Sequence, residues 1–372
     1  MALDRGKIIV YIEKCEIAMN SATGSSLPVK GFFQTDPEIT LVDQLVKAAN
    51  EDGCSGGRIA TTNFYAALKT KPVAILTGPA NSGKLAFVEC FARFLMRDAS
   101  HQCKIMIGHP YWASGSQNVA LFTQLQTRFN TEMLLSLIEE AWQPENSDRL
   151  FIACMARISP AEVENYFSRL AFQLDHGELM CLPYAHFSDP IPFPPNLLIV
   201  GTMDATQFGW WDGQLLSHTG VLLWPKGREN ANPQAAASSA LSNGEGLFLR
   251  SSIRTIRKAR RKLAGILGWR LKGLQPLSQA ATTIEKHTGQ FPKLAIDEAL
   301  IFLANCWSEQ GHGLFDLLPS RNLTIALDLV MAQSLLPRVY KKVHKSRHLR
   351  RELQELLNDQ FPQATAVLTL KG

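Results

Sequence analysis

The 372-residue sequence has few of the features that mark membrane, secreted or disordered proteins. No apolar run approaches the length of about 18 residues that spans a bilayer, and the first residues, MALDRGKIIVYIEK, lack the basic-then-apolar pattern of a signal peptide. Hydrophobic residues make up 46% of the chain and charged residues 19%, which excludes a disordered chain. We therefore expect a cytoplasmic protein of one large or two smaller domains, with no membrane segment.

Cysteine is scarce and scattered along the chain. The seven cysteines include no CxxC pair and follow no zinc-ligand spacing. Their number is odd and their intervals are irregular, which excludes a regular disulfide framework. We expect reduced, mostly buried thiols and no bound metal.

The net charge is mild but unevenly distributed. The sequence contains 38 Lys and Arg against 33 Asp and Glu, a net charge of +5. Residues 226–272 hold eleven basic side chains and two acidic ones, a local charge of +9, so the rest of the chain carries −4. A polyanion would bind through this basic segment.

Short apolar runs alternate with helical patterns from residue 71 to residue 225. The runs are VAILT (73–77), KIMIG (104–108), LFIAC (150–154) and NLLIVGTM (196–203). Their length and their Gly, Pro and Asn boundaries are typical of buried parallel strands. Helical patterns cover residues 83–97, 120–142 and 160–175. This alternation predicts an α/β domain with a parallel sheet over residues 71–225.

The remaining segments have different patterns. Residues 1–70 give weak signals and are interpreted as an N-terminal extension. Residues 226–247 are rich in Gly, Asn, Ala and Ser, which predicts an exposed linker or loop. Residues 248–372 have helical periodicity throughout and predict a smaller, all-helical domain that carries the basic segment.

A phosphate-binding loop follows the first predicted strand. It consists of Gly78, Pro79, Ala80, Asn81, Ser82, Gly83, Lys84 and Leu85. The glycines allow backbone N–H groups to point inward, Lys84 supplies a charge for the β- and γ-phosphates, and the next helix presents its positive end. Leu85 stands where a hydroxyl would bind Mg²⁺, and an apolar side chain cannot replace it. We expect ATP or GTP to bind weakly or independently of Mg²⁺.

The carboxylates of a nucleotide hydrolase are missing from the strand where they are expected. The third apolar run ends at Ala153 and Cys154, and the next acidic residue is Glu162. Asp204, at the carboxyl end of the fourth run, is the candidate to supply a carboxylate near Lys84, because ligands of open α/β sheets bind at that edge.

The order of these segments resembles the AAA+ domain of the McrB family, the GTP-driven motor subunits of modified-cytosine restriction systems. The segments that carry the resemblance are GPANSGK, LFIACMARISPAEVENYFSRL and FPPNLLIVGTMDAT, within about residues 60–225. The resemblance implies a P-loop AAA+ core followed by a helical lid. It also implies a homo- or hetero-oligomer with other subunits of the same system.

Transferred residue by residue, the resemblance implies a degenerate site. Leu85 replaces the Mg²⁺ hydroxyl, Ala153 and Cys154 replace an Asp-Glu pair, and Asp204 occupies the position of a sensor Asn. Residues 212–225 contain no Arg, whereas the family has arginines there that reach a neighbouring subunit's nucleotide. The chain is then expected to be a scaffold or regulator in a multi-subunit assembly, such as a DNA-directed bacterial defence system.

Two other functions stay open on the sequence alone. One is an active ATP or GTP hydrolase that uses Asp204. The other is a nucleic-acid-binding adaptor that uses the basic helical domain. Arg250, Arg254, Arg257 and Arg261 recur at i, i+4, i+7 and i+11, which predicts one basic face of a single helix. Such a face suits contacts with nucleic-acid phosphates.

Overall fold

The computed structural model describes residues 36–54, 56–107, 132–158, 194–204, 216, 219–225, 244–268 and 273–369. The predicted helix over 160–175 and the part of the predicted extension before residue 36 lie outside these ranges. None of the helices in the described ranges combines the length and the apolar character that a bilayer-spanning segment needs.

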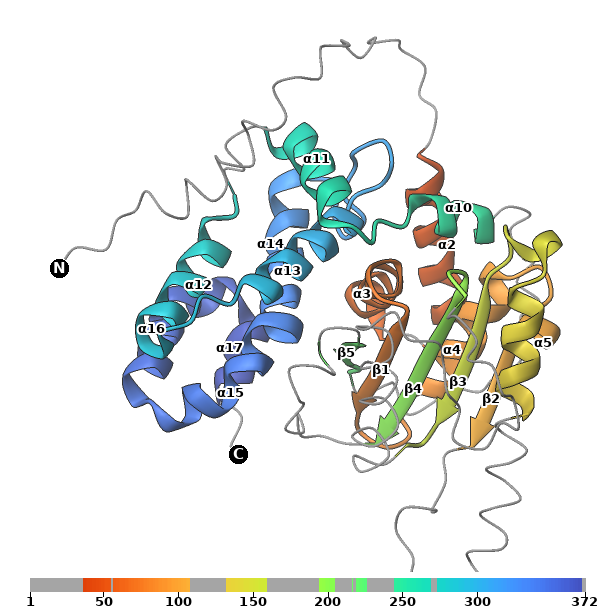
Figure 1. The fold of residues 1–372 in the computed structure, drawn as a ribbon, viewed down its shortest axis with the longest axis horizontal. Helices are drawn as coiled ribbons and strands as arrows, with labels where there is room; N and C mark the ends of the chain where they lie inside the picture. Colours follow the sequence, from red (N-terminus) through yellow and green to blue (C-terminus); the bar gives the residue numbers. More distant parts are fainter. Residues whose placement is uncertain are drawn as a thin grey trace, which may run out of the picture. The chain divides into compact units, whose positions relative to one another are not determined.

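Within the described residues, five strands form one parallel sheet in the order β2-β3-β4-β1-β5 (Figure 1). The strands are β1 (Val73–Gly78), β2 (Cys103–Ile107), β3 (Phe151–Ala156), β4 (Leu197–Asp204) and β5 (Thr219–Leu223). The predicted α/β class and its four parallel strands are confirmed. β5 is not among the strands predicted from the sequence. It pairs with β1 on the side opposite to β4.

Alternate residues of the strands face two apolar cores, one on each side of the sheet. Ala74 and Leu76 of β1 belong to a large cluster that includes α4 (Lys84–Leu95). Val73 and Ile75 belong to a smaller cluster with apolar side chains of the helix at residues 132–141. A parallel sheet is stable when both faces are covered, and the central strands β1, β3 and β4 are buried along almost their whole length.

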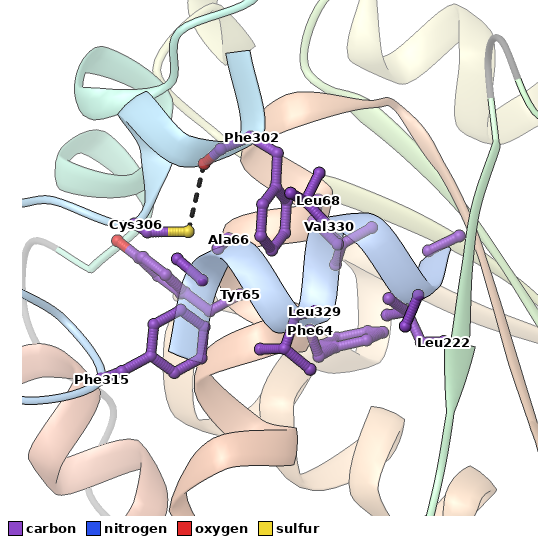
Figure 2. Packing of buried hydrophobic residues seen from close by; sticks show 14 of the residues in the cluster. Phe64, Tyr65, Ala66, Leu68, Leu222, Phe302, Cys306, Phe315, Leu329 and Val330 are labelled. Carbon is purple, nitrogen blue, oxygen red and sulfur yellow. Dashed lines mark hydrogen bonds between the residues drawn. The ribbon is translucent and has the colours of Figure 1, made fainter. Parts of the chain in front are cut away.

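Aromatic side chains connect the N-terminal helices to the sheet. α2 (Pro37–Glu51) and α3 (Gly57–Thr70) precede β1. Phe64 of α3 packs edge-on against Phe87 and Phe91 of α4, with ring centroids 5.3 and 5.0 Å apart. Phe64 and its neighbours also lie among side chains of later helices, including Phe302 and Leu329 (Figure 2). These contacts fix the position of α4, which begins at Lys84.

Short helices make up almost all of the chain described after residue 243. They are α10 (Gly244–Ser251), α11 (Ile256–Leu267), α12 (Gln275–Thr288), α13 (Lys293–Asn305), α14 (Pro319–Val330), a π-helical turn η4 (Met331–Leu335), α15 (Leu336–Lys345), α16 (Arg347–Leu357), the 3₁₀ turn η5 (Asn358–Gln360) and α17 (Pro362–Thr369). The 3₁₀ turn η2 (Pro144–Asn146) and the short α5 (Ala99–Gln102) lie earlier in the chain. One apolar cluster joins the later helices to α3 and α4, so their division into a separate lid stays a prediction.

Two predictions about the basic segment are wrong. The end of the predicted linker, residues 244–247, is helical, and Glu245 there is buried, where it accepts hydrogen bonds from the Arg97 and Leu150 amides. The predicted single basic helix is interrupted between α10 and α11. Ser252 Oγ donates back to the Phe248 carbonyl at 2.7 Å, as serines do where they compete with helical hydrogen bonds.

A side chain far away in the sequence stabilises this interruption between α10 and α11. The Asn305 amide accepts from the Ile253 N–H at 2.9 Å and donates to the Ile253 carbonyl at 2.7 Å. Because both backbone groups of Ile253 are engaged in this way, the helix cannot continue through that residue. The contact is between residues far apart in the sequence, so helical periodicity could not reveal it.

Candidate phosphate-binding site

The loop between β1 and α4 depends on residues that tolerate unusual backbone conformations. Gly83 has φ +81° and Asn81 has φ +57°, in the left-handed region that Gly and Asn adopt most readily. A Cβ at Gly78 would lie 2.3 Å from the Trp224 carbonyl oxygen, so no larger residue fits there. Ala80 and Asn81 form the exposed tip of the loop, whereas Ser82 is buried.

Trp224, directly after β5, holds this loop in place. Its backbone N–H donates to the Thr77 carbonyl at 2.7 Å, and its indole Nε1 donates to the Ser82 carbonyl at 3.1 Å. Its ring packs on Phe87 of α4, with centroids 4.3 Å apart. No local sequence pattern indicates this role of Trp224, because the role depends on β5 lying beside β1.

Lys84 is the first residue of α4, and its side chain is almost completely buried. Its Nζ donates to the Pro79 carbonyl at 2.6 Å, to Ser82 Oγ at 3.0 Å and to the Gly78 carbonyl at 3.2 Å. It also pairs with Asp204 Oδ1 at 2.8 Å. A lysine ammonium has three N–H donors, so these four oxygens already satisfy it. An incoming phosphate oxygen must replace one of them.

Asp204 is the acceptor that a phosphate can replace most readily. It ends β4 directly beside Gly78 of β1, at the carboxyl edge of the sheet. Its side chain is 43% exposed, whereas the other acceptors belong to the loop itself. The expected proximity of Asp204 and Lys84 is therefore found, and a carboxylate occupies a place on Lys84 that suits an anion.

The end of β3 provides no carboxylate. Ala153 and Cys154 are fully buried inside the strand, and burial raises the pKa of the Cys154 thiol well above its ordinary value. Met155 and Ala156, which complete the strand, are apolar as well. The residue after the strand is Arg157, whose N–H donates to Thr202 Oγ1 at 3.0 Å. β3 therefore offers no carboxylate to hold Mg²⁺ or to polarise a water molecule.

Leu85 contributes packing to this site and no ligand atom. Its side chain is partly buried against the large apolar cluster. The first turn of α4 contains no acidic side chain, so its free N–H groups and positive helix end are available to an anion. The loop has the geometry of an anion site, and Leu85 provides no hydroxyl at the position where a magnesium site would have one.

No protein-family model and no curated protein sequence matches this chain. What the loop can bind therefore follows from its own atoms. They are one buried ammonium, a helix N-terminus and a curled backbone, with one competing carboxylate.

The four arginines of the predicted basic face do not share a face. Arg250 lies in α10 and pairs with Glu309 at 3.8 Å. Arg254 lies in the interruption, where its Nη1 donates to the Pro195 carbonyl at 2.7 Å and burial lowers its pKa. Arg257 and Arg261, one turn apart on α11, are exposed.

Proposed function

We propose that this chain is a catalytically degenerate AAA+ subunit that binds a nucleoside phosphate at residues 78–85 without hydrolysing it. The observation that carries the proposal is the position of Lys84. Its buried ammonium and the N-terminus of α4 lie together at the carboxyl edge of the sheet. The absence of acids from β3 and the apolar Leu85 support binding without turnover.

The expected ligand is ATP or GTP, bound weakly or without Mg²⁺. Binding must replace Asp204 on Lys84, which reduces the affinity, and Leu85, the residue after Lys84, has no hydroxyl to offer a metal. Titration calorimetry with ATP, GTP and ADP, in Mg²⁺ and in EDTA, tests this expectation. Equal affinity in the two buffers supports the proposal, and strictly Mg²⁺-dependent binding contradicts it.

The variant Lys84→Ala identifies the site. It should lose at least tenfold in nucleotide affinity, because the ammonium contacts the phosphates directly. Lys104→Ala is the matched control, since that lysine is only partly buried, lies away from the loop, and donates to the Ser100 carbonyl at 2.9 Å. Sustained phosphate release that Lys84→Ala abolishes would instead establish the alternative, an active hydrolase that uses Asp204.

The resemblance to the McrB family extends the proposal to a role in an assembly. We infer a scaffold or regulator within a homo- or hetero-oligomer, in a DNA-directed, restriction-like defence system, with an AAA+ core and a helical lid. Residues 212–225, where the family has arginines, contain no Arg that could reach a neighbouring subunit's nucleotide. Light scattering with and without nucleotide, followed by co-purification with other subunits of such a system, tests this role.

A second candidate function, nucleic-acid binding, is favoured by the exposed charges of α11. Arg257, Lys258 and Arg261 are exposed there, and no carboxylate of the described residues forms an ion pair with them. Phosphate contacts of this kind weaken steeply with salt. Binding of a labelled duplex or single strand, measured at two salt concentrations, should fall in Arg257→Glu/Arg261→Glu.

The matched control for that variant is Lys342→Glu/Lys345→Glu on α15. It changes the net charge equally, at exposed positions on another helix. If both double variants lose binding to the same extent, the effect is one of overall charge. If neither loses binding, α11 is not a nucleic-acid surface.

A further inference from the structure

A cluster of two thiols and one carboxylate lies behind the phosphate loop. Asp52 and Cys54 follow the end of α2, and Cys90 lies in α4. One carboxylate oxygen and the two Sγ atoms all lie within 4.8 Å of one another. The three residues are 7%, 3% and 1% exposed. Convergence of three potential ligands in a buried place differs from the scattered surface acids that commonly gather without an ion.

Contacts around the cluster hold its three side chains together. The thiols of Cys54 and Cys90 are hydrogen-bonded to each other. Cys54 Sγ also reaches the Ala49 carbonyl at 3.6 Å. Arg93 Nη2 contacts Asp52 Oδ2 at 2.6 Å, which orients the carboxylate and supplies a positive charge. Hydrogen bonds from residues around a metal site commonly orient the residues that bind the metal.

We propose that Asp52, Cys54 and Cys90 bind a thiophilic divalent cation of the Zn²⁺ class. Two thiolates and one carboxylate are ligands that zinc accepts, and they leave the fourth tetrahedral position to a water molecule. With Zn–S bonds of about 2.3 Å, two sulfurs on one ion are about 3.8 Å apart, so the cluster needs little contraction. Binding releases the two thiol protons, and Arg93 offsets the remaining negative charge.

An ion bound at this position would stabilise the phosphate loop. Cys90 is less than two helical turns beyond Lys84 on α4. A Cβ built on Gly83 would lie 3.5 Å from Cys54 Cα, so the two backbones are in contact. The ion would therefore tie the connection after α2 to the helix that begins at the phosphate loop.

Cobalt binding tests the proposal on the reduced, full-length chain after chelator treatment. We expect one Co²⁺ per chain, with thiolate-to-cobalt charge-transfer and tetrahedral d–d absorption bands that Zn²⁺ displaces. Cys54→Ser and Cys90→Ser should each lose the charge-transfer intensity of one thiolate and weaken binding at least tenfold. Zn²⁺ should raise the Tm of the wild type but not that of either variant.

Cys306→Ser is the matched control, because this buried thiol donates to the Phe302 carbonyl at 3.2 Å and a serine hydroxyl can keep that bond (Figure 2). It should bind Co²⁺ as the wild type does. Should the two cysteine variants fail to fold, Asp52→Asn provides the second test: it should keep the thiolate bands and weaken binding. Wild type that binds no Co²⁺ when reduced, or variants with unchanged spectra, would overturn the proposal.

Discussion

The most informative single change in this protein is Asp204→Asn. It removes the negative charge that contacts Lys84 Nζ at 2.8 Å and keeps the size of the side chain. Because Asp204 occupies a place on the ammonium that a phosphate needs, the change should strengthen nucleotide binding. The active-hydrolase alternative predicts the opposite, since there Asp204 would hold the metal.

The size of the effect follows from the geometry around Nζ. Two oxygens that both lie 2.8 Å from a tetrahedral nitrogen are about 4.6 Å apart. Unit charges at that separation repel by about 0.9 kcal/mol in water and about 3.6 kcal/mol at an effective dielectric constant of about 20. The carboxylate is 43% exposed, so screening places the value towards the lower limit. We expect about 1.4 kcal/mol, which is about tenfold in affinity.

Titration of ADP in EDTA measures this gain without a contribution from metal. Asp148→Asn is the control, because Asp148 is also partly exposed and pairs with Arg97 at 2.7 Å instead of with Lys84. The control should leave the affinity unchanged. An affinity that falls in Asp204→Asn would refute competition between Asp204 and phosphate for Lys84, and loss of Mg²⁺-dependent phosphate release in the same variant would favour the hydrolase.

Three further changes test other contacts. Trp224→Phe removes the indole bond to the Ser82 carbonyl and should cost about 1 kcal/mol in urea unfolding, together with nucleotide affinity. Lys69→Met leaves the fully buried Glu38 without its cation and should cost about 3–5 kcal/mol, of which Glu38→Gln in the same chain should restore part. Burial lowers the pKa of Lys262 to about 8, so above that pH the folded chain has lost a proton that the unfolded chain keeps. Relative to Lys262→Met, the wild type should therefore gain on the order of 1 kcal/mol of stability between pH 7 and pH 9, and a constant difference would contradict this.

The strands were predictable because burial on both faces leaves an uninterrupted apolar run. VAILT and NLLIVGTM match β1 and β4 to within one residue at every end, since Gly, Pro and Asn limit them. β5 was missed because its apolar run is short and follows a polar stretch. The break between α10 and α11 was missed because it depends on Asn305, whose contact with Ile253 no local pattern encodes.

The candidate site was predictable only in its local part. The loop glycines and Lys84 are adjacent in sequence, so their spacing alone indicates an anion site. Asp204 was found from the rule that ligands bind at the carboxyl edge of a parallel sheet. Trp224 and the pair Cys54 and Cys90 were not found, because each depends on tertiary contact between separate elements.

The surroundings of Lys84 also explain how the loop at residues 78–85 is stabilised by the chain itself. A buried ammonium without a counter-charge would be strongly destabilising, so the fold needs an anion beside it. Asp204 supplies that charge at the edge where a phosphate would supply it, and a neutral Asn would not. The same carboxylate that stabilises the loop would therefore lower the affinity of the loop for a phosphate.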